Sequence, residues 1–211
     1  MSPLGENRHL QFEQLELRAM LAGNVLVSVV DGDLQVAGDD KDNVLEFQQL
    51  SPSNPRALHG GVSFQISPDA DTSINGNDPG VGIVVAGVTR DIDVDMGEGG
   101  DELVVLGANG HQVRDLLIDA GSGPDAVSIT GFKLSRDVRV SSADSLDLSI
   151  QRTSAADVFV KIDGIKGEPK DTAVAVPTSS VTIRNSTLRG SVNVSSHVPL
   201  AVNIRGNDVG A

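Results

Sequence analysis

Two stretches of the sequence decide the fold: DIDVDMGEGGDELVV at residues 91–105 and DLLIDAGSGPDAVSI at residues 115–129. Each opens on an aspartate, continues as a short alternating strand, passes through a Gly/Asp turn and ends in a second apolar strand. Related copies begin at Asp33, Asp137 and Asp157, and the last four copies start 24, 22 and 20 residues apart. A period of this length with no helical pattern predicts an all-β fold, a parallel β-helix (β-solenoid) of 20–24-residue coils.

The composition agrees with stacked short strands. The 211 residues include 28 Val, 23 Gly and 22 Asp, with five Phe as the only aromatic residues and no Cys. We expect Val and Ile of successive coils to stack into an all-aliphatic core. Without Cys there is no disulfide, no thiolate zinc site and no cysteine nucleophile. Near the C-terminus, VTIRNSTLRG at residues 181–190 is echoed 21 residues later by VNIRGNDVG at residues 202–210, which extends the coils.

The net charge of −13 excludes one class of partner. Most of the excess acid lies in residues 31–171, within and around the repeat turns. Nucleic acid is a poor partner for such a chain, because each phosphate contact needs a cation. No apolar run approaches the length that a transmembrane span needs, so we expect no membrane span.

The N-terminal part differs from the repeats. Residues 10–22 hold the only helical periodicity, and Gly23 supplies a stop. We therefore divide the chain into an N-terminal, partly helical segment at residues 1–30 and a β-solenoid repeat domain at residues 31–211. The domain carries a loop insertion at about residues 164–177, which is rich in Lys and Pro.

Two resemblances bear on localisation. FEQLELRAMLAG at residues 12–23 resembles the N-terminal LEPR-XLL segment of large surface or secreted proteins of planctomycete bacteria, with Leu17 in place of the usual Pro and Met20 in place of a Leu. Residues 24–165 resemble a repeat region common in the same proteins, through the phrases at residues 32–43 and 87–101. The resemblance implies an extracellular or cell-surface solenoid whose N-terminal segment serves export or sorting.

The repeat turns are also candidates for calcium. Gly-x-Gly-x-Asp at residues 97–101 and 121–125, and Gly-x-Asp-x-Asp at residues 38–42, are similar to the calcium-binding nonapeptide of RTX proteins, although here the motifs are not in tandem. The candidate oxygen ligands are Asp40, Asp42, Asp101, Asp125 and Asp147. We expect Asp101, Asp125 and Asp147 to stack about 4.8 Å apart, the spacing of neighbouring strands. A cation, backbone N–H donors or splayed side chains must then relieve their repulsion; the alternative is that these aspartates form solvated Asx turns.

Two functions from different classes remain. The first, which the sequence favours, is a non-catalytic module with a structural, spacer or adhesion role, whose partners are other surface proteins, polysaccharide or further copies bound through the solenoid ends. The second is a carbohydrate-active β-helix of the polysaccharide lyase or hydrolase kind. Asp39-Asp40 and His59-Gly60 superficially resemble steps of polygalacturonases, but no Arg-x-Lys step follows. An aspartate ladder along one turn would favour the first function. Convergence of Asp, Arg and His in one groove would favour the second.

Overall fold

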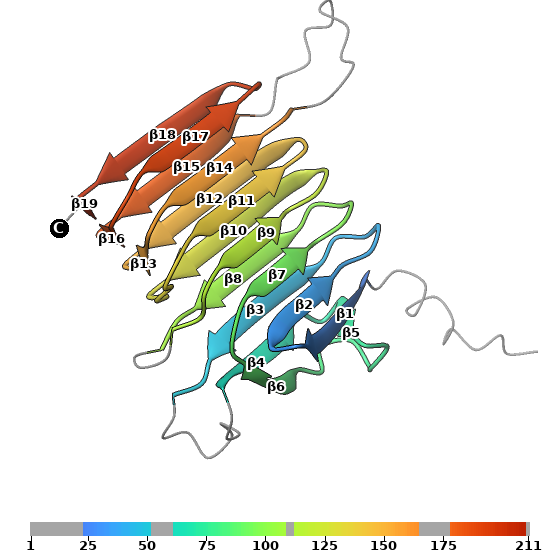
Figure 1. Ribbon diagram of the computed structural model, residues 1–211. Helices are drawn as coiled ribbons and strands as arrows, with labels where there is room; N and C mark the ends of the chain where they lie inside the picture. Colours follow the sequence, from blue (N-terminus) through green and yellow to red (C-terminus); the bar gives the residue numbers. More distant parts are fainter. Residues whose placement is uncertain (1–22, 52–60, 109–111, 165–177, 210–211) are drawn as a thin grey trace, which may run out of the picture.

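The computed structural model describes residues 23–51, 61–108, 112–164 and 178–209, and all of the regular structure in these ranges is β-strand (Figure 1). This confirms the all-β prediction. The predicted helix at residues 10–22 and nearly all of the predicted insertion, residues 165–177, lie outside the described residues. Strand β1 begins at Gly23, so residues 23–30, which we assigned to the N-terminal segment, form a strand that pairs with β2.

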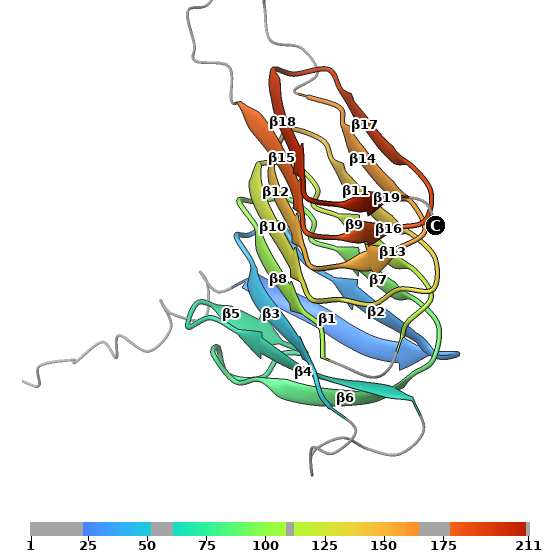
Figure 2. The same ribbon diagram turned by 90° about the vertical axis from the view of Figure 1, so that its left-hand side faces the viewer.

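The strands form two eight-stranded sheets that face each other, and a small third sheet (Figures 1 and 2). Sheet one contains, in chain order, β1 (Gly23–Val30), β2 (Asp33–Ala37), β5 (Thr72–Ile74), β7 (Ile92–Asp95), β9 (Leu116–Asp119), β11 (Val138–Ser142), β14 (Val158–Ile162) and β17 (Val192–Ser196). Sheet two contains β3 (Val44–Gln49), β4 (Val62–Pro68), β6 (Ile83–Val88), β8 (Glu102–Leu106), β10 (Pro124–Thr130), β12 (Ser145–Gln151), β15 (Ser179–Arg184) and β18 (Leu200–Arg205). The third sheet contains β13 (Ser154–Ala155), β16 (Thr187–Leu188) and β19 (Asp208–Val209).

From β7 to β12 the chain alternates between the two large sheets, and after β12 it also passes through the third sheet. Each strand from β7 to β16 pairs in parallel with its equivalent one repeat later. In sheet one Ile92 lies opposite Leu116, Leu116 opposite Val138, and Val138 opposite Val158. These registers are the 24-, 22- and 20-residue steps of the sequence repeat. In sheet two Val181 lies opposite Val202 and Leu188 of the third sheet lies opposite Val209, which is the 21-residue C-terminal echo. The sequence period is therefore the pairing register.

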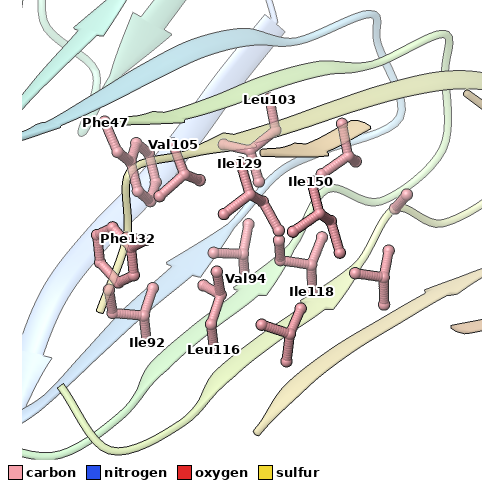
Figure 3. Packing of buried hydrophobic residues seen from close by; sticks show 14 of the residues in the cluster. Phe47, Ile92, Val94, Leu103, Val105, Leu116, Ile118, Ile129, Phe132 and Ile150 are labelled. Carbon is pink, nitrogen blue, oxygen red and sulfur yellow. The ribbon is translucent and has the colours of Figure 1, made fainter. Parts of the chain in front are cut away.

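The core lies between the two sheets and is built of columns of equivalent residues. Because side chains alternate along a strand, every second residue faces inward. One column runs through Val36, Val94, Ile118, Val140 and Val160, all of them nearly fully buried. Figure 3 shows part of this packing, with Val94 and Ile118 from sheet one close to Ile129 and Ile150 from sheet two.

The prediction of an all-aliphatic core is wrong in one respect. Phe47, Phe64 and Phe132 are among the largest fully buried side chains. Phe64 and Phe132 stack with their ring centroids 6.1 Å apart. The buried aromatic rings include Phe47 of β3 and Phe64 of β4, whereas the columns of the later strands are aliphatic, as expected.

The N-terminal end departs from parallel stacking, which the repeat pattern did not predict. Strand β1 is antiparallel to β2, and β4 is antiparallel to both β3 and β6. Strands β4, β5 and β6 lie in the 58-residue interval between Leu34 and its partner Ile92, and β1 precedes Leu34 in the chain. Together they add a block of strands at this end of the stack (Figure 2).

In the part of the chain that the structure describes, no helix has the length and apolar character needed to cross a membrane.

Candidate functional site

A continuous stack of aspartates runs along the start of the sheet-one strands. Each member lies at or just before the first residue of a strand, and its carboxylate accepts the backbone N–H of the equivalent residue one repeat later, at Oδ1. The aspartate ladder consists of Asp33, Asp91, Asp115, Asp137 and Asp157, and ends at the N–H of Ser191. The N–H to Oδ1 distances between successive aspartates are 3.0, 3.2, 2.9 and 3.3 Å. Side chains thereby extend the hydrogen bonding between successive repeats beyond the strands themselves.

Arginines neutralise part of this stacked charge. Arg114 donates through Nε to Asp91 Oδ1 at 2.7 Å and contacts Asp91 Oδ2 through a second nitrogen. Its Nε also lies 3.5 Å from Asp115 Oδ2, and Arg136 reaches the same oxygen at 3.5 Å. The hydrogen bond to Asp91 raises the pKa of the Arg114 guanidinium above its ordinary value. Each ladder carboxylate is therefore used in structure, and the repulsion between neighbours is reduced by N–H donors and by cations of the same chain.

We missed these arginines in the sequence, although a signal was present. Arg90, Arg114 and Arg136 each stand directly before a ladder aspartate, in three successive repeats. The Arg-Asp pair therefore recurs with the same 24- and 22-residue steps as the strands. Arg90 lies 3.5 Å from Asp33 in the preceding repeat, in the same manner as Arg114 beside Asp91.

A ladder aspartate can be removed without touching the core. We expect Asp115→Ala to lower the free energy of unfolding by about 1–3 kcal/mol, because the buried N–H of Asp137 loses its acceptor. Asp115→Asn keeps an oxygen acceptor and loses only the charge beside Arg114 and Arg136, so its loss should be clearly smaller. Urea denaturation at neutral pH measures both variants. Equal stability of the alanine variant and the parent would show that the ladder does not hold the repeats together.

A second stack lies at the start of the sheet-two strands. Asn43 donates its N–H to Asp101 Oδ1 at 2.7 Å, and Asp101 donates its N–H to Asp125 Oδ1 at 3.2 Å. Ser142 donates its hydroxyl to Asp125 Oδ2 at 3.2 Å. Asp101 and Asp125 are only 3% and 4% exposed. We call these two residues the buried carboxyl pair. Each carboxyl accepts a backbone N–H from the preceding repeat, whereas each carboxylate of the aspartate ladder accepts a backbone N–H from the following repeat.

Burial changes the protonation of this pair. Desolvation raises the pKa of Asp101 to about 6 and that of Asp125 to about 7, although hydrogen bonds from Asn43, the Asp101 N–H and Ser142 act in the opposite direction. Asp101 Oδ2 and Asn43 Oδ1 are buried without a hydrogen-bond partner. A proton on Asp101 Oδ2 would turn this unpartnered acceptor into a donor, which adds to desolvation in raising the pKa of Asp101.

The predicted calcium ligands do not all come together. Leu146, not Asp147, lies opposite Asp125, while Asp147 lies opposite Ala126 and accepts a hydrogen bond from Ser180. The prediction that Asp147 continues the Asp101–Asp125 stack is wrong, because two residues separate β11 from β12 whereas four separate β9 from β10.

The other two candidates belong to the first repeat, and Asp42 lies beside the Asp101–Asp125 stack. Asp40 is exposed and pairs with Lys41 at 3.4 Å, and Asp42 Oδ1 accepts the N–H of Gly100 at 2.7 Å. Within the described ranges, no three or more His, Asp or Glu side chains are grouped so that they could hold a metal ion. Calcium binding remains a prediction.

Asx turns occur, but at other aspartates than those proposed. Asp95 Oδ1 accepts the N–H of Gly97 at 3.1 Å, and Asp119 Oδ1 accepts that of Gly121 at 3.3 Å.

Close stacking of the turns explains the glycines of the Gly-x-Gly-x-Asp motif. A Cβ on Gly121 would lie 1.6 Å from the carbonyl oxygen of Gly97, and one on Gly123 would lie 1.9 Å from that of Gly99.

The outer face of sheet one has two shallow hollows of opposite charge. One, of about 260 Å³, is lined by Arg139, Phe159 and Lys161 among others, with the Arg139 guanidinium 4.6 Å from the centre of the Phe159 ring. The other is lined by Asp93, Asp95 and Asp119. Partial burial first, and then the neighbouring aspartates, raise the pKa of Asp93. Among the described residues, His197 lines neither hollow; it is exposed, with Nδ1 3.9 Å from Asp163. His9, His59 and His111 lie outside the described residues.

Comparison of the chain with protein-family models, with curated proteins and with solved structures finds no match.

Proposed function

We propose that this chain is a non-catalytic parallel β-helix (β-solenoid) module with a structural, spacer or adhesion role outside the cell or on its surface. The observation that carries the proposal is the aspartate ladder. Its carboxylates bind the backbone of the next repeat and, at Asp33, Asp91, Asp115 and Asp137, arginines of the same chain. Carboxylates used in this way hold repeats together and are not free to serve as a general acid and base.

The β-helix assignment rests on the path of the chain. From β7 to β12 the strands alternate between sheet one and sheet two, and every strand pairs in parallel with its equivalent one repeat later. The short strands β13, β16 and β19 add a third parallel strip along the side (Figure 2). Such a stack has a long, regular surface and few loops, which suits a spacer or a binding surface better than a closed catalytic cleft.

One observation favours the alternative, a carbohydrate-active β-helix enzyme. The hollow beside Arg139 and Lys161 combines cations with an aromatic ring, a combination that suits acidic polysaccharide. Both cations are already paired, however, Arg139 with Asp137 at 3.0 Å and Lys161 with Asp163 at 2.6 Å. We therefore place polysaccharide among the candidate partners, together with other surface proteins and further copies of the chain.

Product assays separate the two functions. The full chain is incubated with pectin, alginate and chondroitin, and reducing ends and unsaturated products are measured with and without added calcium. We expect no release above that of a heat-denatured sample. Release that depends on intact protein would overturn the structural function in favour of the enzyme. The extracellular location rests on the LEPR-XLL-like residues 12–23 and is tested by fractionating cells that express the chain with this segment present or deleted.

Calcium stabilisation has its own test. If calcium bridges the turns, EGTA lowers the melting temperature of the parent protein, and added calcium restores it. The double variant Asp101→Asn, Asp125→Asn then no longer responds to either treatment. A parent melting temperature that EGTA leaves unchanged would remove calcium from the proposal and leave the N–H donors of successive repeats as the elements that hold the turns.

A further inference from the structure

The last described strands leave core residues uncovered. Val202 and Ile204 of β18 lie opposite Val181 and Ile183 of β15, and so occupy the same inward-facing columns. Val181 and Ile183 are fully buried, whereas Val202 and Ile204 are 49% and 45% exposed. Within the described ranges no strand pairs with the outer edge of β17 or β18. This end, which we call the β18 end (β17 and β18 with the turn between them), therefore presents an open sheet edge backed by apolar side chains.

The opposite end is also apolar at its rim. Strand β6 is the outermost described strand of sheet two, and its Ile83 and Val85 lie opposite the fully buried Ile66 and Phe64. Ile83 and Val85 are themselves only half-buried, and nearby Val81 and Val84 are among the exposed large apolar side chains. We call this the β6 end (residues 61–88, containing β4, β5 and β6); Figure 2 shows it at the foot of the stack.

Strand directions allow the two ends to be joined. Strand β6 is antiparallel to β4, which is antiparallel to β3. Strand β6 therefore runs in the same direction as β3 and as all the parallel strands of sheet two, including β18. A second copy placed in line with the first can thus add its β6 to β18 as a further parallel strand of sheet two, while its β5 would meet β17 of sheet one as an antiparallel strand.

The charges of the two ends are complementary. Arg205 is the only Lys or Arg of the β18 end itself, which has no Asp or Glu, and Arg184 lies opposite Arg205 on the neighbouring strand β15. Residues 61–88 of the β6 end carry Asp69, Asp71 and Asp78 and no Lys or Arg. Joining two β18 ends would bring Arg205 of one copy against Arg205 of the other, and joining two β6 ends would bring aspartates against aspartates. Only the head-to-tail arrangement brings opposite charges together.

We propose that the chain assembles head to tail with further copies of itself, the β18 end of one copy on the β6 end of the next. The inference deepens the self-association named among the candidate partners above. Because this contact joins two different surfaces, each copy that binds leaves one new β18 end or β6 end free. The assembly is therefore linear and not limited to a dimer, and it covers the apolar rims at both ends of every internal copy.

Sedimentation velocity of the full chain tests this arrangement. We expect the average mass to rise past that of a dimer as protein concentration increases, and to fall with added salt, because salt screens the Arg–Asp attraction. A parent that stays monomeric at all concentrations would overturn the proposal. Assembly that stops at two copies would also overturn it, because it would indicate contact between like ends.

Blocking one end at a time makes the test specific. Ile204→Lys places a charge on the β18 edge, and the double variant Val81→Lys, Val84→Lys does the same at the β6 end. We expect each variant alone to remain monomeric and an equimolar mixture to form one-to-one dimers and nothing larger, because only one intact pair of ends is left. Leu26→Lys is the control, since Leu26 is exposed on β1, whose two edges are already paired with β2 and β5; it should assemble as the parent does.

Circular dichroism and thermal melting show whether each variant keeps its fold. If a lysine variant unfolds, the salt dependence of the parent decides the question by itself. Assembly of Ile204→Lys to the same extent as the parent would overturn the proposed contact. The outcome is separable from the proposed function: polysaccharide cleavage would reject the non-catalytic function while leaving assembly untouched, and a strictly monomeric, inactive protein would reject only the assembly.

Discussion

Gly121→Ala is expected to cost about 3 kcal/mol or more of folding free energy and to unfold much of the protein at 37 °C. Gly121 has a φ of +80°, a region that residues with a Cβ rarely occupy. The added methyl carbon would also lie 1.6 Å from the carbonyl oxygen of Gly97 in the preceding repeat. That oxygen accepts the N–H of Ser122 at 3.1 Å, so it cannot move away without breaking the bond between the two turns.

Gly76→Ala is the matched control for this prediction. Gly76 also has a positive φ, +71°, but a Cβ there would meet no atom within 4 Å. We therefore expect Gly76→Ala to cost only about 1–2 kcal/mol, from backbone conformation alone. Denaturation curves of the two variants separate the contribution of turn stacking from that of the dihedral angle. Equal losses in the two variants would mean that the Gly97 and Gly121 turns are not packed on each other as the structure has them.

The sequence repeats predicted the parallel half of the fold well, because the pairing register is the repeat length. Aligning Asp91, Asp115, Asp137 and Asp157 in the sequence is the same operation as aligning them in space. The antiparallel strands β1, β4 and β6 could not be found in this way, because they have no equivalents in other repeats. Which strand follows which at that end depends on hairpins whose sequences show only alternation.

The candidate site was harder to predict, because one residue more or less in a turn changes which side chains of successive repeats lie opposite each other. The regular ten-residue spacing of aspartates suggested that Asp147 continues the stack of Asp101 and Asp125. A shorter turn before β12 shifts the register, and Leu146 takes that place. The roles of the aspartates were also divided differently from our expectation. The strand-initial aspartates bind backbone N–H groups and arginines, and the pair after the glycines is buried; spacing alone does not separate these environments.

The buried carboxyl pair leads to the prediction that the protein becomes less stable as the pH rises from about 4 to about 7. Burial raises the pKa values of Asp101 and Asp125 to about 6 and about 7, from the ordinary aspartate value of 3.8. Over this window the folded chain binds more protons at these groups than the unfolded chain does. Stability therefore falls with increasing pH, and the full penalty is present above the folded pKa values. A shift of one pKa unit corresponds to about 1.4 kcal/mol, so we expect a loss of about 2–4 kcal/mol between pH 5 and pH 8.

Asp125→Asn assigns this pH dependence to the pair. The amide keeps an oxygen that accepts the N–H of Asp101, and its NH₂ group can donate to Ser142, so the hydrogen bonds survive while the buried charge is lost. We expect the variant to be more stable than the parent at pH 8 and about as stable as the parent at pH 5. Its free energy of unfolding should therefore change less with pH between these two values. Asp119→Asn is the control, because it makes the same chemical change at an exposed site and should leave the pH profile unchanged. A variant that is more stable than the parent at pH 8 would also mean that no bound metal ion compensates the charge of Asp125 in the parent. An Asp125→Asn variant that loses stability at pH 8 would instead show that the ionised carboxylate is the form on which the turn depends.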